Sequence, residues 1–141
     1  MSEAPSPLPK DAVRIGSVGF NVFAGPIYRL SPAGGEMAGH FAFVPEQKHM
    51  NGSGAVHGGM LMTFADVSMS QAARAVFDGK GCNTVSLSCD FVSPGKFGEL
   101  IESRVRVTRR TRTMVFISAE VVAGDRPLLI ATGLWKLANV A

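Results

Sequence analysis

Residues 57–77 have the sequence HGGMLMTFADVSMSQAARAVF, and this stretch decides the fold of the chain. Residues 58–77 contain no proline, and residues 60–65 are apolar almost all round. The pattern predicts a long helix that is buried on most sides. The next residues, Asp78-Gly79-Lys80-Gly81, predict the end of the helix, because glycine readily closes one.

Strand patterns flank this helix on both sides. Before it, we expect an extended segment over residues 20–30, a turn over 31–35, a strand over 36–44 and a loop over 45–55. After it, we expect strands over residues 84–92, 100–108, 114–122 and 128–137. Antiparallel strands with one buried helix make an α+β fold, in which a twisted sheet wraps around the helix.

The composition is that of one globular domain with few surface charges. The chain has 141 residues, of which 46% are hydrophobic and only 18% are charged, against about 25% charged in typical domains. These values exclude intrinsic disorder, a coiled coil and a collagen-like chain. The shortage of charge suggests that part of the surface is buried in an oligomer. Three prolines in residues 1–10 predict a flexible tail before a domain over 11–141.

Charge and patterning also bear on partners and location. The net charge of +3 permits an anionic ligand but does not demand nucleic acid. The sequence has no apolar run near the roughly 18 residues of a membrane span, and its first residues do not resemble a secretory signal. Cys82 and Cys89 are too few for a disulfide framework. We therefore expect a cytoplasmic protein that binds neither nucleic acid nor a membrane.

The start of the predicted helix is a candidate anion site. His57-Gly58-Gly59 would expose backbone N–H groups that the helix itself does not satisfy, and the helix dipole adds positive potential there. Such an end can hold a carbonyl oxygen and the oxyanion that it becomes. Glycine also allows a ligand to approach the backbone closely. The alternative is a plain glycine-rich loop before a helix.

Asp66 is the second candidate, because it lies in the middle of the apolar helix. A buried carboxylate is costly unless it is paired or used, which suits a general base or a nucleophile. The alternative is an aspartate on one solvent-facing stripe of the helix, hydrogen-bonded to Ser70. His57 and Asp66 are nine residues apart, which places them on opposite sides of a helix and about 13 Å apart along it. If both act in one reaction, Asp66 must meet the His57-Gly58 end of another subunit.

The pattern Asn51-x5-His57-Gly58-Gly59-x6-Asp66, followed by Phe91-Val92-Ser93-Pro94 and then Gly98-Glu99, resembles a known family. It is similar to the hotdog-fold acyl-CoA thioesterases of the phenylacetyl-CoA thioesterase (PaaI-like) type, over roughly residues 25–137. The resemblance implies an antiparallel sheet of about five to six strands around one central helix. It also implies an acyl-CoA substrate, no cofactor beyond that coenzyme A, and a homodimer, often paired into a tetramer.

The resemblance also implies roles for individual residues. Asp66 would be the general base or nucleophile, and the Gly58 N–H and Asn51 would polarise the thioester carbonyl. His57 would organise the loop, Gly59 would lie beside the substrate, and Thr84 would orient water. The coenzyme A phosphates would lie near a basic turn, where the candidates are Arg109, Arg110 and Arg112. The alternative for these arginines is a solvated turn.

Other readings of the sequence are weaker. His40, His49 and His57 offer no close ligand pair, so we expect no metal site. A non-catalytic acyl-CoA-binding module of the same fold is the alternative function. A hydratase is disfavoured by Asn51 together with His57-Gly58-Gly59. The sequence does not specify the acyl group, although Phe20, Tyr28, Phe64 and Phe77 are candidates to shape an aromatic-tolerant pocket.

Overall fold

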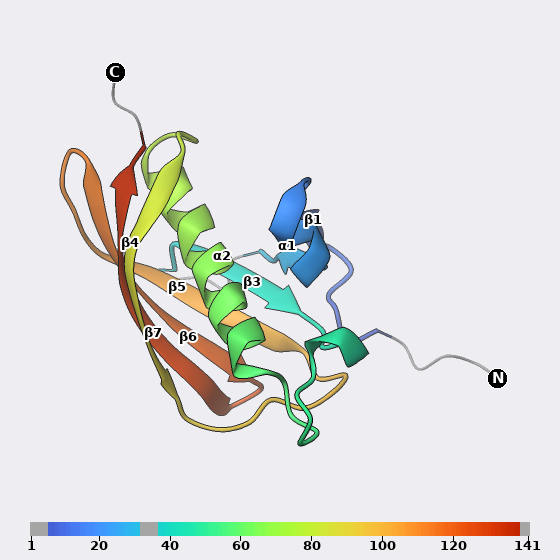
Figure 1. The fold of residues 1–141 in the computed structure, drawn as a ribbon. Coiled ribbons are helices and arrows are strands. Elements are labelled where there is room, and N and C mark those ends of the chain that lie inside the picture. Colours follow the sequence, from blue (N-terminus) through green and yellow to red (C-terminus); the bar gives the residue numbers. More distant parts are fainter. Residues whose placement is uncertain (1–5, 32–36, 139–141) are drawn as a thin grey trace.

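The computed structural model describes residues 6–31 and 37–138, which build one antiparallel sheet around a long helix (Figure 1). The elements in chain order are β1 (Val13–Ile15), α1 (Gly19–Ala24), β2 (Ile27–Arg29), β3 (Gly39–Phe43), the 3-10 turn η1 (Gln47–His49), α2 (Gly58–Val76), β4 (Cys82–Phe91), β5 (Ile101–Arg110), β6 (Met114–Ala123) and β7 (Arg126–Leu137). The seven strands lie in the order β1-β2-β3-β5-β6-β7-β4. This confirms the α+β hotdog fold.

The core fills the space between α2 and the concave face of the sheet. Trp135 and Phe64 are fully buried there. The few polar groups in this core are paired, which removes the cost of burying them. The Trp135 indole N–H donates to the Ser70 hydroxyl over 2.9 Å, and Ser103 donates to Ser68 over 2.7 Å. These bonds fix the long helix on the sheet and so fix the groups that it carries.

The structure differs from the sequence-based expectation before α2. Seven strands form the sheet, not five to six, because residues 13–15 add a short edge strand. The predicted extended segment over 20–30 is wrong in its first half, where α1 forms instead. Tertiary contacts hold this helix: the Lys48 ammonium donates to the Phe23 carbonyl over 2.8 Å, and His49 Nε2 bonds the Ala24 carbonyl over 2.6 Å. Residues 1–5 of the predicted tail, 32–35 of the turn and Glu36 lie outside the described residues.

Strand β4 is the long free edge of the sheet. It follows α2 directly and runs back beside it to the helix N-terminus (Figure 1). Unlike the central strands it is mostly exposed, with Val85 and Phe91 both 54% exposed. A β-bulge between Thr84 and Ser86 interrupts its pairing with β7. No helix among residues 6–31 and 37–138 is long and apolar enough to cross a membrane.

Gly133 of β7 is expected to tolerate no side chain. A Cβ there would lie 2.6 Å from two carbons of the Trp135 ring and 2.7 Å from the Ser86 carbonyl oxygen. Because overpacking forces the backbone apart, Gly133→Ala should lower the free energy of unfolding by about 1–3 kcal/mol. Urea denaturation measures this, and Gly52→Ala is the control, since nothing lies within 4 Å of its Cβ position. Equal stability of both variants would contradict the prediction.

Candidate active site

The N-terminus of α2 presents a free backbone donor. His57 caps the helix: its Nδ1 accepts from the Gly59 N–H over 2.8 Å, and its carbonyl accepts from Met60 and Leu61 over 2.9 and 3.2 Å. The Gly58 N–H makes no hydrogen bond to any described residue. The prediction that His57-Gly58-Gly59 opens the helix is confirmed. His57 uses its ring to order this turn, and Gly58 keeps an N–H for a ligand.

Asn51 lies beside Gly58 in a groove of about 350 Å³ that Phe91 also lines. Its side-chain oxygen accepts from the N–H groups of Ser53 and Ala55 over 2.8 and 3.0 Å. The side-chain NH₂ is therefore the group of Asn51 that can donate to a ligand. The Phe91 ring packs against the helix start, since a Cβ on Gly58 would lie 3.2 Å from it. The groove thus holds two donors beside one aromatic wall.

Asp66 lies on the open stripe of α2 and pairs with β4. Its carboxylate accepts from the Thr84 hydroxyl over 2.8 Å. The carboxylate is partly exposed, so the expectation of deep burial is wrong for this chain by itself. The sheet wraps most of α2 but leaves this stripe uncovered. The alternative partner, Ser70, instead accepts from Trp135.

The bulge in β4 puts Thr84 and Phe91 on the same face. The two residues are seven apart, so regular alternation would turn them to opposite faces of the strand. The register shift between Thr84 and Ser86 inserts one extra residue, Val85, and resets that alternation. Thr84 therefore bonds Asp66 while Phe91 packs against Gly58. Both ends of β4 carry a side chain toward α2.

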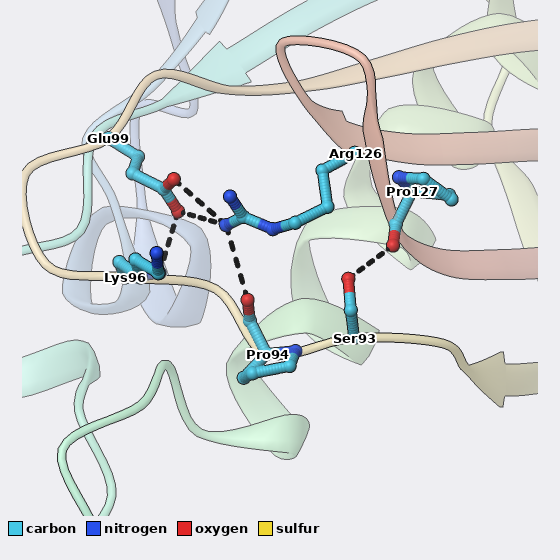
Figure 2. A network of polar contacts seen from close by, with 6 residues as sticks. All are labelled: Ser93, Pro94, Lys96, Glu99, Arg126 and Pro127. Atoms are coloured by element: carbon cyan, nitrogen blue, oxygen red, sulfur yellow. Dashed lines mark hydrogen bonds and ion pairs between the residues drawn. The ribbon is translucent and has the colours of Figure 1, made fainter.

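A network of polar contacts holds the loop after β4 (Figure 2), and this loop in turn supports the loop before α2. The Glu99 carboxylate accepts from the Lys96 N–H over 2.7 Å and from the Arg126 guanidinium over 2.8 Å. That guanidinium also donates to the Pro94 carbonyl over 3.3 Å. Between these anchors, the Gly95 carbonyl accepts from the Val56 N–H over 2.9 Å. The Pro94 and Glu99 positions of the motif thus hold in place the residue before His57.

Cys89 is a neighbour of Asp66 and is not a competing nucleophile. Burial raises the pKa of its thiol, and the carboxylates of Asp90 and Asp66 raise it further. The thiol therefore stays protonated near neutral pH, and the thiol form is a poor nucleophile. Within residues 6–31 and 37–138, no three His, Cys, Asp or Glu side chains gather to hold a metal ion. Asp66 remains the candidate reactive group on this part of α2.

The predicted basic turn is shorter than expected, because β5 continues through Arg110. The Arg110 guanidinium donates to the Val76 carbonyl over 3.0 Å and lies over the Phe77 ring, 5.2 Å from its centroid. It closes the C-terminal end of α2, the end opposite to Gly58. Arg109 and Arg112 are exposed beside it. Their contact with coenzyme A stays a prediction.

The predicted residues form two clusters in one chain. Asn51 and Gly58 lie beside Phe91 near the start of α2. Asp66 lies about two helical turns further along α2, where it accepts a hydrogen bond from Thr84 of β4. His57 and Gly59 line a second pocket on the other side of the helix start. Sequence reasoning missed two residues: Phe91, which forms a wall of the groove, and Phe23, which lines the second pocket. Phe91 could have been suspected from its place in the motif that ends at Pro94. No sequence pattern pointed to Phe23, because its segment was predicted to be extended.

Comparison with known proteins shows the family of this chain. The thioesterase superfamily model matches residues 53–130. The Pseudomonas aeruginosa protein PA0474 is 34% identical over 93 residues, which are 65% of this chain and 69% of that one. Human acyl-coenzyme A thioesterase 13 is 30% identical over 88 residues, which are 62% of this chain and 63% of that enzyme. The solved Escherichia coli PaaI protein, 18% identical, has the same fold, with a TM-score of 0.72 over 80% of each chain. The chain therefore belongs to the thioesterase superfamily, whose general reaction is thioester hydrolysis.

Proposed function

We propose that this protein hydrolyses acyl-CoA thioesters to a free acid and coenzyme A, at a site shared by two copies of the chain. One observation carries the proposal. The oxyanion donors lie at one end of the free edge strand β4, and the carboxylate lies at the other end. Thr84 and Phe91 are seven residues apart, which is at most about 23 Å along β4 at ~3.3 Å per residue. One chain therefore holds two half-sites.

Antiparallel pairing of β4 with a second β4 would join the two halves. Such a pair places the Thr84 end of each strand beside the Phe91 end of the other. Asp66 of one copy, which bonds Thr84, would then lie near Gly58 of its partner. The sparse surface charge and the uncovered stripe of α2 support the same contact.

The main chain of β4 is suited to this pairing. The Val92 N–H, directly after β4, donates to the carbonyl of Leu128 in β7 over 2.8 Å. In an antiparallel ladder the bonded residues alternate, so Asp90 and Ser88 also point their N–H groups toward β7. Leu87 and Cys89 then turn their N–H and C=O groups to the free edge. This unpaired edge would otherwise be open to uncontrolled pairing with other strands.

The reaction follows from the groups that this pairing assembles. The Gly58 N–H and the Asn51 NH₂ would hold the thioester oxygen and stabilise the negative charge that develops on it. Asp66 of the other copy would take a proton from water, whose oxygen bonds to the carbonyl carbon. Thr84 holds one carboxylate oxygen, which leaves the second for that water. The C–S bond then breaks, and the coenzyme A thiolate leaves and takes up the proton.

Thiol release from purified full-length protein tests this function. We expect turnover of at least one of acetyl-, hexanoyl-, benzoyl- and oleoyl-CoA, in proportion to enzyme and with equal amounts of acid and thiol. The alternative, an acyl-CoA-binding module, would bind these compounds without releasing thiol. Saturable binding of every compound together with no thiol release would therefore refute the proposed activity.

A further inference from the structure

A second pocket, of about 410 Å³, lies between α1 and the first two turns of α2. The proposed reaction does not itself use it. Its apolar walls are Phe20, Phe23 and Ala24 from α1 and Met60 from α2, and the exposed residues His57 and Gly59 line it at the start of α2. The volume is within the range of small-molecule sites, about 300–1,000 Å³.

The pocket is lined by the two chain neighbours of the proposed oxyanion donor, Gly58. His57 and Gly59 line it, and the free N–H of Gly58 lies between these two residues in the chain. On the other side of Gly58 is the groove lined by Asn51 and Phe91. A thioester carbonyl bound at Gly58 has two substituents, the acyl group and the sulfur of coenzyme A. The structure offers one hollow for each.

The chemistry of the walls favours the acyl group. His49 Nε2 bonds the Ala24 carbonyl, and the Lys48 ammonium donates one of its three N–H groups to the Phe23 carbonyl. None of the described residues that line the pocket carries a carboxylate. A polar pantetheine chain would find few partners there, whereas an uncharged hydrocarbon group would bury apolar surface. Met60 adds a flexible side chain that adapts to different shapes.

Helix α1 presents two largely exposed aromatic rings. Phe20 is 64% exposed and Phe23 is 75% exposed, and their ring centroids are 6.4 Å apart. Apolar surface gathered at the rim of a pocket marks a binding site more often than an accident of packing. The bonds from Lys48 and His49 hold the C-terminal end of α1 in place, so the rings form a defined wall.

We propose that this pocket binds the acyl group of the substrate, and that Phe20 and Phe23 select bulky apolar acyl groups over small ones. The inference rests on the proposed thioesterase function, and it assigns α1 the role of specificity element. The pocket would favour hexanoyl-CoA over acetyl-CoA, because only the longer chain reaches the aromatic wall.

Steady-state kinetics of single-site variants test the assignment. We expect Phe23→Ala and Phe20→Ala each to lower kcat/KM for hexanoyl-CoA roughly tenfold, while kcat/KM for acetyl-CoA changes less than about twofold. Phe97→Ala is the matched control, since Phe97 is an equally exposed phenylalanine, 61%, in the loop after β4. It should leave both substrates unchanged. Equal losses on both substrates, or no loss on hexanoyl-CoA, would overturn the assignment.

A binding measurement separates this inference from the proposed function. Hexanoyl-CoA is titrated calorimetrically into Asp66→Asn and into Asp66→Asn/Phe23→Ala, neither of which needs to turn over. We expect the second variant to bind about tenfold more weakly than the first, with no such difference for acetyl-CoA. If wild type cleaves no thioester, the function fails, and this titration still decides the pocket. Equal affinity of the two variants for hexanoyl-CoA would refute the acyl site whatever the activity.

Discussion

Asp66→Asn is expected to lower kcat by about 10²- to 10⁴-fold, the usual contribution of a general base, and to leave KM nearly unchanged. Asparagine keeps the size of the side chain and its hydrogen bond from Thr84, but it cannot accept the proton of water. The proposed oxyanion donors, Gly58 and Asn51, lie on a different part of the chain and stay in place. Thiol release under saturating and limiting substrate gives both constants.

Asp78→Asn is the matched control for this substitution. Asp78 is an exposed aspartate just beyond α2 with a φ of 55°, a conformation that asparagine adopts readily. It makes the same chemical change at the opposite end of the helix from Gly58, and kcat should stay within about twofold of wild type. A retained kcat in Asp66→Asn would remove this carboxylate from the mechanism.

Mixing two inactive variants tests whether the site is shared between chains. Asp66→Ala lacks the base and Asn51→Ala lacks an oxyanion donor, so each alone should be inactive. After subunit exchange, a mixed dimer would carry one site with both defects and one site with none. An equal mixture should then regain about a quarter of wild-type activity. A site built within one chain would regain nothing, and that result would refute the shared site while leaving a role for Asp66 intact.

The main features of the fold could be predicted from the sequence, because strong periodic patterns produced them. Helix α2 begins at Gly58 as expected, and its C-terminal end is within one residue of the prediction. Val105 alternates with Arg104 and Arg106 in the sequence, as expected for a half-buried strand, and in β5 Val105 is buried while both arginines are exposed. The spacing of His57 and Asp66 indicated that these residues do not meet in one chain. The structure agrees, because Asp66 is hydrogen-bonded to Thr84, whereas Gly58 lies in the groove that Asn51 lines.

The parts that sequence reasoning missed depend on tertiary contacts. Helix α1 has only six residues, too few to be stable alone, and contacts from Lys48 and His49 hold it. The β-bulge at Thr84 gives no signal in the sequence of β4, yet it sets which side chains face α2. Arg110 looked like a surface charge, but its target is the carbonyl end of α2. The contacts that hold α1 and that place Arg110 join residues that are more than twenty positions apart in the sequence.

Leu87→Pro is expected to separate the proposed dimer and to lower turnover by more than about a hundredfold, because each chain would be left with half a site. Leu87 lies near the middle of β4, and its N–H faces the free edge, so proline there removes a bond to a partner without removing one to β7. Size-exclusion chromatography with light scattering should show a monomer. Far-UV circular dichroism should show that the sheet is retained.

Leu87→Ala is the control that separates the backbone effect from the loss of the side chain. Leu87 packs partly against the core, so both variants lose that contact and should lose similar stability. Only the proline variant lacks the N–H that a second β4 would need. If the alanine variant stays dimeric and active while the proline variant is an inactive, folded monomer, pairing through the β4 edge is what completes the site. A monomeric proline variant with full activity would show instead that one chain brings Asp66 to its own Gly58 by a rearrangement of α2.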